Sequence, residues 1–144
     1  MRFFLAGIMQ GSHLGEVLHN QSYRGHIKQI LAEHFPRCQV YDPLADHQDS
    51  LNYDDDKARK VFLAHNRLCC EMDVVLAFVP EASMGTAIEM WEAYRHGAVV
   101  IAISPLVHNW AIKFCSDQVF ADLDSFESGL NSGQVQQLIG KKKN

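Results

Sequence analysis

Residues 73–89 read DVVLAFVPEASMGTAIE, and this stretch decides the fold. The segment Asp73–Val79 is almost entirely apolar, which is typical of a strand buried on both faces of a parallel sheet. Ser83 then stands where the N-cap of a helix is expected, and Gly97 marks the end of the helix predicted over Met84–His96. A buried strand, a short loop and a helix in this order predict an α/β fold.

The same alternation of strand and helix patterns continues on both sides of this stretch. Ser22 is a possible N-cap of the first helix. In the helix after the third strand, Met84, Met90 and Trp91 are expected to pack in the core. Strands are predicted at Arg2–Ala6, Cys38–Tyr41, Ala98–Ile103 and Val119–Phe120, and helices at Gln21–His34, from Asp54 to Met72, and from Leu123 to Leu138 with interruptions at Gly129 and Gly133.

Right-handed crossovers leave few ways to arrange these elements. We expect a doubly wound, five-stranded parallel sheet with strand order 2-1-3-4-5. This is a Rossmann-like or flavodoxin-like three-layer sandwich, formed by residues 1–144 as one domain. Such sheets bind ligands outside the carboxyl ends of their strands, at the switch between strands 1 and 3. The loops Gly7–Ser12 and Pro80–Gly85 are therefore the expected ligand-binding segments.

Composition excludes several classes of partner. The chain has 144 residues, of which 47% are hydrophobic, and a formal net charge of −4. Nucleic-acid backbones require a basic surface, so no nucleic acid is expected as partner.

The sequence also gives no sign of a membrane partner. No apolar run reaches the ~18–20 residues of a membrane span, and the N-terminus predicts a strand, not a signal peptide. The four cysteines include no C-x-x-C pair, which favours reduced thiols in a cytoplasmic protein without disulfides, metal or cofactor.

The loop after the third strand carries the strongest candidate for chemistry. Ser83 and the free amides of Met84 and Gly85 form an anion site at a helix N-terminus. Glu89 shares a helix face with Gly85, and this position at the switch point suits a nucleophilic or anion-stabilising carboxylate as well as it suits an ordinary surface glutamate. His65 lies on the inward stripe of the second helix, as a core histidine or as a functional one.

These segments resemble the nucleoside 2-deoxyribosyltransferase family, which includes 2-deoxynucleoside 5-monophosphate N-glycosidases. The likeness runs from about Arg2 to Phe120 and is strongest over Asp73–Glu89. It implies that Glu89, which closes the G-x-x-x-E stretch, attacks C1 of the sugar and releases the base. A covalent glycosyl-enzyme would then pass the sugar to another base or to water, as in retaining glycosidases.

The resemblance also implies roles for other residues. Ser83 stands where nucleoside transferases tend to have an acidic residue and monophosphate N-glycosidases a serine, which favours a 5-monophosphate substrate. His65 replaces the usual aspartate and is expected to give a proton to the leaving base. Asn109 matches an asparagine that completes the neighbouring subunit's pocket, which implies a homodimer or larger homo-oligomer. The first strand and its loop are expected to line the sugar through Phe3 (in place of a tyrosine), Gly7, Ile8 and Gly11.

The sequence thus predicts cleavage or transfer at the N-glycosidic bond of a (deoxy)nucleoside or its 5-monophosphate. The alternative is a non-catalytic nucleotide-binding or regulatory domain on the same fold. A phosphoryl-receiver domain is disfavoured because Asp73 opens the third strand instead of closing it. A flavodoxin is disfavoured because the first loop has no Ser/Thr-rich phosphate cradle.

Overall fold

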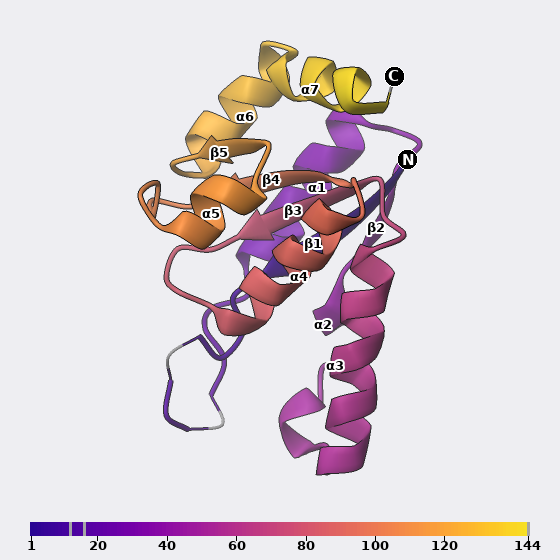
Figure 1. Ribbon diagram of the computed structural model, residues 1–144, viewed down its shortest axis with the longest axis vertical. Helices are drawn as coiled ribbons and strands as arrows, with labels where there is room; N and C mark the ends of the chain where they lie inside the picture. The colour runs from indigo at the N-terminus through magenta and orange to yellow at the C-terminus, as the bar shows by residue number, and fades with distance from the viewer. Residues whose placement is uncertain (12, 16, 144) are drawn as a thin grey trace.

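Five parallel strands form one sheet in the order β2-β1-β3-β4-β5, as the sequence predicted (Figure 1). The computed structural model describes residues 1–11, 13–15 and 17–143, so Ser12, at the end of the expected first loop, lies outside the described residues. In the parallel register, Phe3 is paired with Val74, and Val74 with Val99. The strands are β1 (Arg2–Gly7), β2 (Gln39–Tyr41), β3 (Val74–Phe78), β4 (Val99–Ile103) and β5 (Gln118–Phe120).

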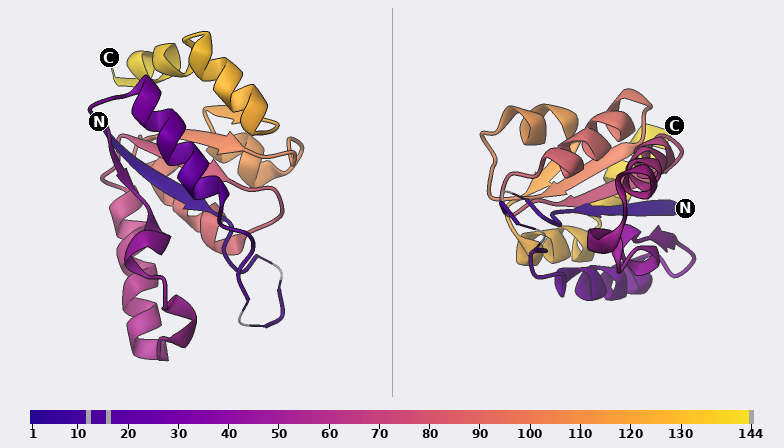
Figure 2. Two further views of the ribbon diagram at one scale, coloured as in Figure 1. Left: turned by 180° about the vertical axis from the view of Figure 1, so that it is seen from behind. Right: turned by 90° about the horizontal axis from the view of Figure 1, so that it is seen from below.

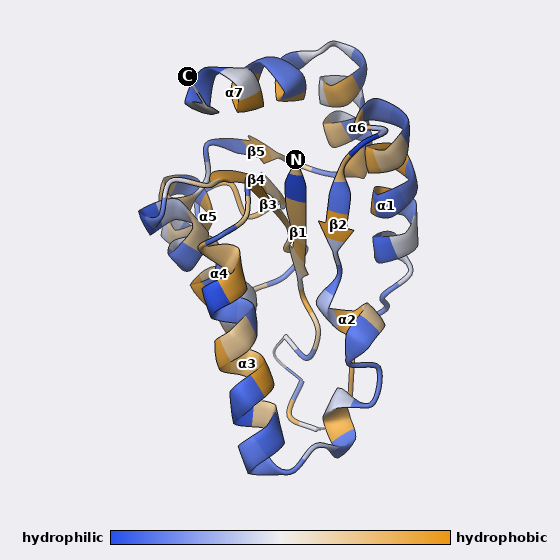
Figure 3. Ribbon diagram, turned by 90° about the vertical axis from the view of Figure 1, so that its right-hand side faces the viewer, coloured by the Kyte–Doolittle hydropathy of each residue, from blue (hydrophilic) through white to orange (hydrophobic). Residues whose placement is uncertain are grey.

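Helices cover both faces of the sheet, which gives three layers (Figure 2). Seen from the side, α3 and α4 lie across the sheet from α1 (Figure 3). The helices are α1 (Tyr23–His34), α2 (Pro43–Asp46), the 3-10 turn η1 (Ser50–Asn52), α3 (Asp55–Cys69), α4 (Met84–Arg95), α5 (Trp110–Cys115), α6 (Leu123–Asn131) and α7 (Gln134–Lys143). Among the described residues, no helix is both long and apolar enough to cross a bilayer.

Alternation along β1 builds a separate core on each face of the sheet. Phe3 and Leu5 pack with α1, α6 and α7, whereas Phe4 and Ala6 pack with α3, α4 and α5. All four side chains are buried. Because β3 and β4 are also buried on both faces, their near-continuous apolar sequences were the clearest strand signals.

Helix ends follow the expected chemistry in most places. Asp54 caps α3 by accepting a hydrogen bond from Lys57 N, and Gly97 ends α4 with φ of +80°. Ser22 directly precedes α1 as expected, but its backbone is already helical and its side chain makes no capping hydrogen bond. The last helical region breaks at Gly133, with φ of +78°, while Gly129 lies inside α6.

Two predicted core residues lie at the surface. Met84 is 84% exposed and Trp91 is 49% exposed, whereas Met90 is fully buried. The face of α4 that carries Met84, Ile88 and Trp91 is therefore apolar but uncovered in the single chain. An uncovered apolar face on a helix is typical of an interaction surface.

Candidate active site

A cavity of about 320 Å³ opens at the carboxyl ends of β1 and β3, at the switch point of the sheet. Its walls come from the loop after β1, the middle of α3 and the first turns of α4. The sequence-predicted residues that it brings together are Gly7, Gly11, His65, Ser83, Gly85 and Glu89. Met9, Gln10, Phe62, Met84 and Thr86 also line this cavity, which we call the switch-point pocket.

Glu89 is the acidic residue among those lining the pocket. It lies on α4, and its side chain is partly buried. Burial raises the pKa of its carboxyl from 4.5 to about 8, and the positive charge of Arg24 opposes this rise. At neutral pH most molecules of the free protein therefore carry Glu89 in its protonated form. An environment that shifts a cleft carboxyl this far is typical of an active site.

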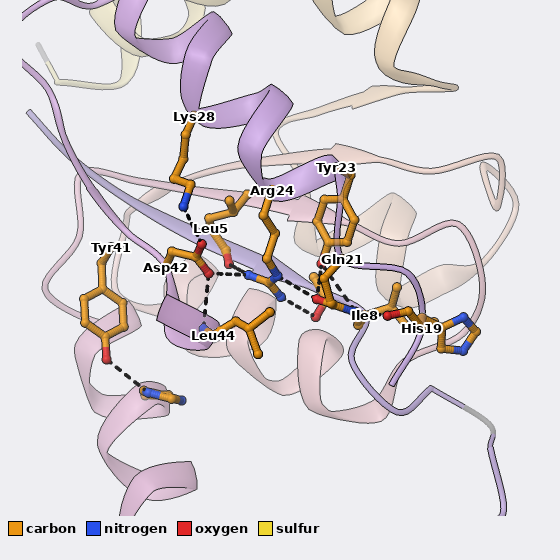
Figure 4. Close-up of polar contacts among 12 residues, drawn as sticks. Leu5, Ile8, His19, Gln21, Tyr23, Arg24, Lys28, Tyr41, Asp42 and Leu44 are labelled. Atoms are coloured by element: carbon orange, nitrogen blue, oxygen red, sulfur yellow. Dashed lines mark hydrogen bonds and ion pairs between the residues drawn. The ribbon is translucent and has the colours of Figure 1, made fainter. Parts of the chain in front are cut away.

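Arg24 holds the start of α1 against the end of β1 (Figure 4). Its guanidinium donates to Asp42 Oδ1 at 2.9 Å and to the carbonyl oxygens of Leu5 at 3.1 Å and Gly7 at 3.4 Å. Both members of the ion pair are buried. Arg24 is thus a structural cation bonded to the backbone of Gly7, which lines the pocket, but Arg24 itself is not among the lining residues.

Tyr23 brings a phenol close to the pocket from α1, a contribution that the sequence did not indicate. Its hydroxyl donates to the carbonyl oxygen of Ile8 at 3.3 Å, and its ring stacks on Phe78. Burial raises the pKa of Tyr23 to about 12, with a smaller contribution from the charge of Glu89. A Cβ at Gly7 would overlap this hydroxyl, which explains the glycine there.

Ser83 caps α4 as predicted. Its hydroxyl oxygen accepts from Thr86 N at 3.4 Å and lies 2.9 Å from the Thr86 hydroxyl. Helix geometry leaves the amides of Met84 and Gly85 without intrahelical acceptors. A Cβ at Gly85 would meet no atom within 4 Å, so this side of the helix start is open. The arrangement suits an anionic group bound at the helix N-terminus.

A second cavity, of about 290 Å³, shares His65 and Phe62 with the switch-point pocket. His65 Nε2 lies 3.1 Å from the Tyr41 hydroxyl, and its ring is 5.2 Å from that of His47. Burial, reinforced by His47, lowers the pKa of His65 from 6.5, so the neutral imidazole predominates at pH 7. His47 and Tyr53 also line this cavity. They come from the segment between β2 and α3, where no spacing pattern in the sequence marked them as site residues.

Three of the predicted residues do not line the switch-point pocket of their own chain. Phe3 packs against Phe35 on the α1 side of the sheet and does not line the switch-point pocket. Ile8 lines a separate cavity with Tyr23. Asn109 is exposed and caps α5, with Oδ1 accepting from the amides of Ala111 and Ile112. It lines a small hollow together with Ser83 and Met84.

Comparison with solved structures identifies proteins that share this fold. A 2-deoxyribosyltransferase from Bacillus psychrosaccharolyticus matches with a TM-score of 0.63 and 18% identity over 88% of this chain and 90% of that chain. This chain has the fold of that deoxyribosyltransferase. The CMP N-glycosidase of Clostridium botulinum matches with a TM-score of 0.53 and 19% identity over 92% and 99% of the two chains.

A conserved protein from Enterococcus faecalis has the same fold, with a TM-score of 0.63 and 15% identity over 92% of this chain and 98% of that chain. No protein-family model matches the chain, and no curated protein matches it by sequence. The likeness therefore lies in the fold, which is the fold that the resemblance implied.

Proposed function

We propose that this protein cleaves or transfers at the N-glycosidic bond of a (deoxy)nucleoside or its 5-monophosphate, with Glu89 as nucleophile. The observation that carries the proposal is the shifted carboxyl of Glu89 in a pocket that also contains an open helix N-terminus. The shared fold with a deoxyribosyltransferase and an N-glycosidase supports the same reaction class.

In the proposed reaction, Ser83 and the first amides of α4 bind the 5-phosphate or 5-hydroxyl. The ionised Glu89 carboxylate forms a bond to C1 of the sugar while the bond from C1 to the base nitrogen breaks. The electron pair of that bond goes to the base, which takes a proton from protonated His65. Water or another base then attacks C1, its proton passes to the now neutral His65, and the bond from C1 to Glu89 breaks to release the carboxylate. We assign the leaving base to the cavity beside His47 and Tyr53.

The pH dependence of kcat/KM tests the proton assignments. Reaction requires ionised Glu89, whose pKa is about 8, and protonated His65, whose pKa is lowered from 6.5. We expect kcat/KM to fall below the pKa of His65 and also above about pH 8. In His65→Gln the alkaline fall should disappear, so that kcat/KM rises to about pH 8 and then levels off. A wild-type profile without the alkaline fall would exclude His65 as proton donor.

Substrate preference tests the function itself. Incubation with matched nucleosides and 5-monophosphates should release free base, faster from monophosphates. Ser83→Asp keeps a good N-cap residue but repels the phosphate. Because hydrogen bonds to charged groups contribute about 1.5–3 kcal/mol, we expect this variant to lose at least roughly tenfold in affinity for the monophosphate. Ser83→Asn is the matched neutral control. Equal affinities for both substrates in wild type would refute the phosphate assignment, and binding without base release would favour the non-catalytic alternative.

We also propose that a second copy covers the apolar face of α4 and α5. Met84 lines the switch-point pocket and is 84% exposed, while Trp110, next to Asn109, is 77% exposed. A copy seated there would close the pocket mouth and bring its own Asn109 near it. Sedimentation should show a dimer at micromolar concentration, which Trp110→Glu dissociates and the control Leu14→Glu leaves intact. A monomeric wild type would contradict the proposal.

A further inference from the structure

Three side chains with metal-binding atoms meet where the end of α3 packs on α4. Cys70 follows the last residue of α3, Glu92 lies near the end of α4, and His96 follows that helix. Cys70 Sγ, a carboxylate oxygen of Glu92 and a ring nitrogen of His96 all lie within 4.8 Å of one another. None of the three lines the switch-point pocket. Because Cys70 and the other two residues are far apart in sequence, no spacing motif indicated this group.

We propose that Cys70, Glu92 and His96 bind a divalent transition metal of the Zn²⁺ class. With metal–sulfur and metal–oxygen bonds of about 2.3 and 2.0 Å, neighbouring tetrahedral ligands lie about 3.5 Å apart. Cys70 Sγ is 3.6 Å from Glu92 Oε2, and His96 Nδ1 is 3.8 Å from the same oxygen. The three groups therefore already have nearly the separation that a tetrahedral ion requires.

The donor set also suits the chemistry of such an ion. A thiolate, an imidazole and a carboxylate together are typical ligands of Zn²⁺ or Co²⁺, whereas Mg²⁺ and Ca²⁺ prefer oxygen alone. The two negative ligands balance the charge of a divalent ion. The Cys70 thiol now donates toward Glu92, so binding would form the metal–sulfur bond and release the thiol proton to water.

The environment of each ligand leaves room for an ion. His96 is exposed, and its Nδ1 lies 2.9 Å from the carbonyl oxygen of Glu92. Binding through Nδ1, the ring nitrogen near Glu92 Oε2, requires the tautomer that carries its proton on Nε2, and Nδ1 then offers its lone pair to the ion. The partial exposure of Cys70 and Glu92 lets water occupy the fourth position. The neighbouring Cys69 is fully buried in the core and fixes the end of α3 beside the cluster.

Titration of the reduced, full-length protein with Co²⁺ tests the proposal. We expect an equimolar complex with a sulfur-to-cobalt charge-transfer band in the near ultraviolet and tetrahedral visible bands, both abolished by excess Zn²⁺. Cys70→Ser should remove the charge-transfer band. His96→Ala should weaken affinity by more than the roughly 10–100-fold that loss of an outer-shell partner costs. The control Cys115→Ser should bind as wild type.

Thermal unfolding provides a second readout that does not depend on any enzymatic activity. Zn²⁺ should raise the Tm of wild type and of Cys115→Ser, because a ligand that binds the native state stabilises it, but not that of Cys70→Ser. Equal Tm values without metal establish that the variants fold. Absence of the charge-transfer band in wild type at millimolar Co²⁺, or its persistence in Cys70→Ser, would overturn the proposal. Neither result bears on base release by Glu89.

Discussion

Replacing Glu89 by glutamine is expected to abolish base release and to stabilise the protein at neutral and alkaline pH. Loss of a nucleophile that acts together with other groups commonly lowers kcat by more than about a thousand-fold. Glutamine keeps the size of the side chain but cannot form the glycosyl ester. The measurement is base release by wild type and Glu89→Gln at pH 8, where Glu89 is about half ionised. Glu33→Gln, which removes an exposed carboxylate from α1, is the control.

The stability part of this prediction follows from the raised pKa. Below about pH 4.5, Glu89 is protonated in both the folded and the unfolded chain. Between pH 4.5 and about 8, the unfolded chain loses this proton and the folded chain keeps it, so the free energy of unfolding falls as pH rises. One pKa unit corresponds to about 1.4 kcal/mol, so the variant should gain roughly 2–5 kcal/mol at pH 8 relative to pH 4.5.

Denaturant unfolding of both proteins at these two pH values measures the gain. A difference that does not change with pH would contradict the raised pKa of Glu89. Wild-type base release by Glu89→Gln would refute the covalent mechanism. The two results are independent, since the first reports the surroundings of the carboxyl and the second its part in the reaction.

Replacing Arg24 by methionine should destabilise the protein by about 3–5 kcal/mol, the usual effect of removing one partner from a buried ion pair. The change leaves Asp42 without its buried partner and removes the donor to the carbonyl oxygens of Leu5 and Gly7. Lys28 also binds Asp42, at 2.9 Å, but its side chain is 42% exposed. Lys28→Met should therefore cost no more than about 1 kcal/mol.

Denaturant unfolding of the two single variants gives the comparison. The double variant Arg24→Met with Asp42→Asn should recover part of the loss, because asparagine leaves no unpaired buried charge and can still cap α2. Equal losses of unfolding free energy in Arg24→Met and Lys28→Met would show that the buried Arg24–Asp42 pair stabilises the protein no more than the exposed Lys28–Asp42 pair. Since the charge of Arg24 lowers the pKa of Glu89, the alkaline limb of kcat/KM should also move to higher pH in Arg24→Met.

The fold was predictable because its signals are local. The apolar runs of β3 and β4 are buried on both faces, and the handedness of crossovers restricts the strand order. Ser83, Gly85 and Glu89 were also accessible to prediction, since one loop and one helix position them together. Their place at the switch point follows from the fold itself.

The remaining features depend on contacts between distant segments. Tyr23 and Arg24 reach the end of β1 from α1, and His47 meets His65 across the second cavity. Hydrophobic periodicity carries no information on such pairings. The exposure of Met84 was missed for a related reason, because an apolar helix face packs equally well on a sheet or on another copy of the chain.

The interior position of β1 has a consequence for the order of folding. The strand β2 and the Arg24–Asp42 pair lie within the first part of the chain, so β1, α1 and β2 can assemble soon after they are synthesised. The other edge of β1 must wait for β3, whose Val74 pairs with Phe3, and until then it offers a strand edge to other chains. Glu89 is made later still. Nascent chains that end before α4 are therefore expected to hold the ion pair but no pocket.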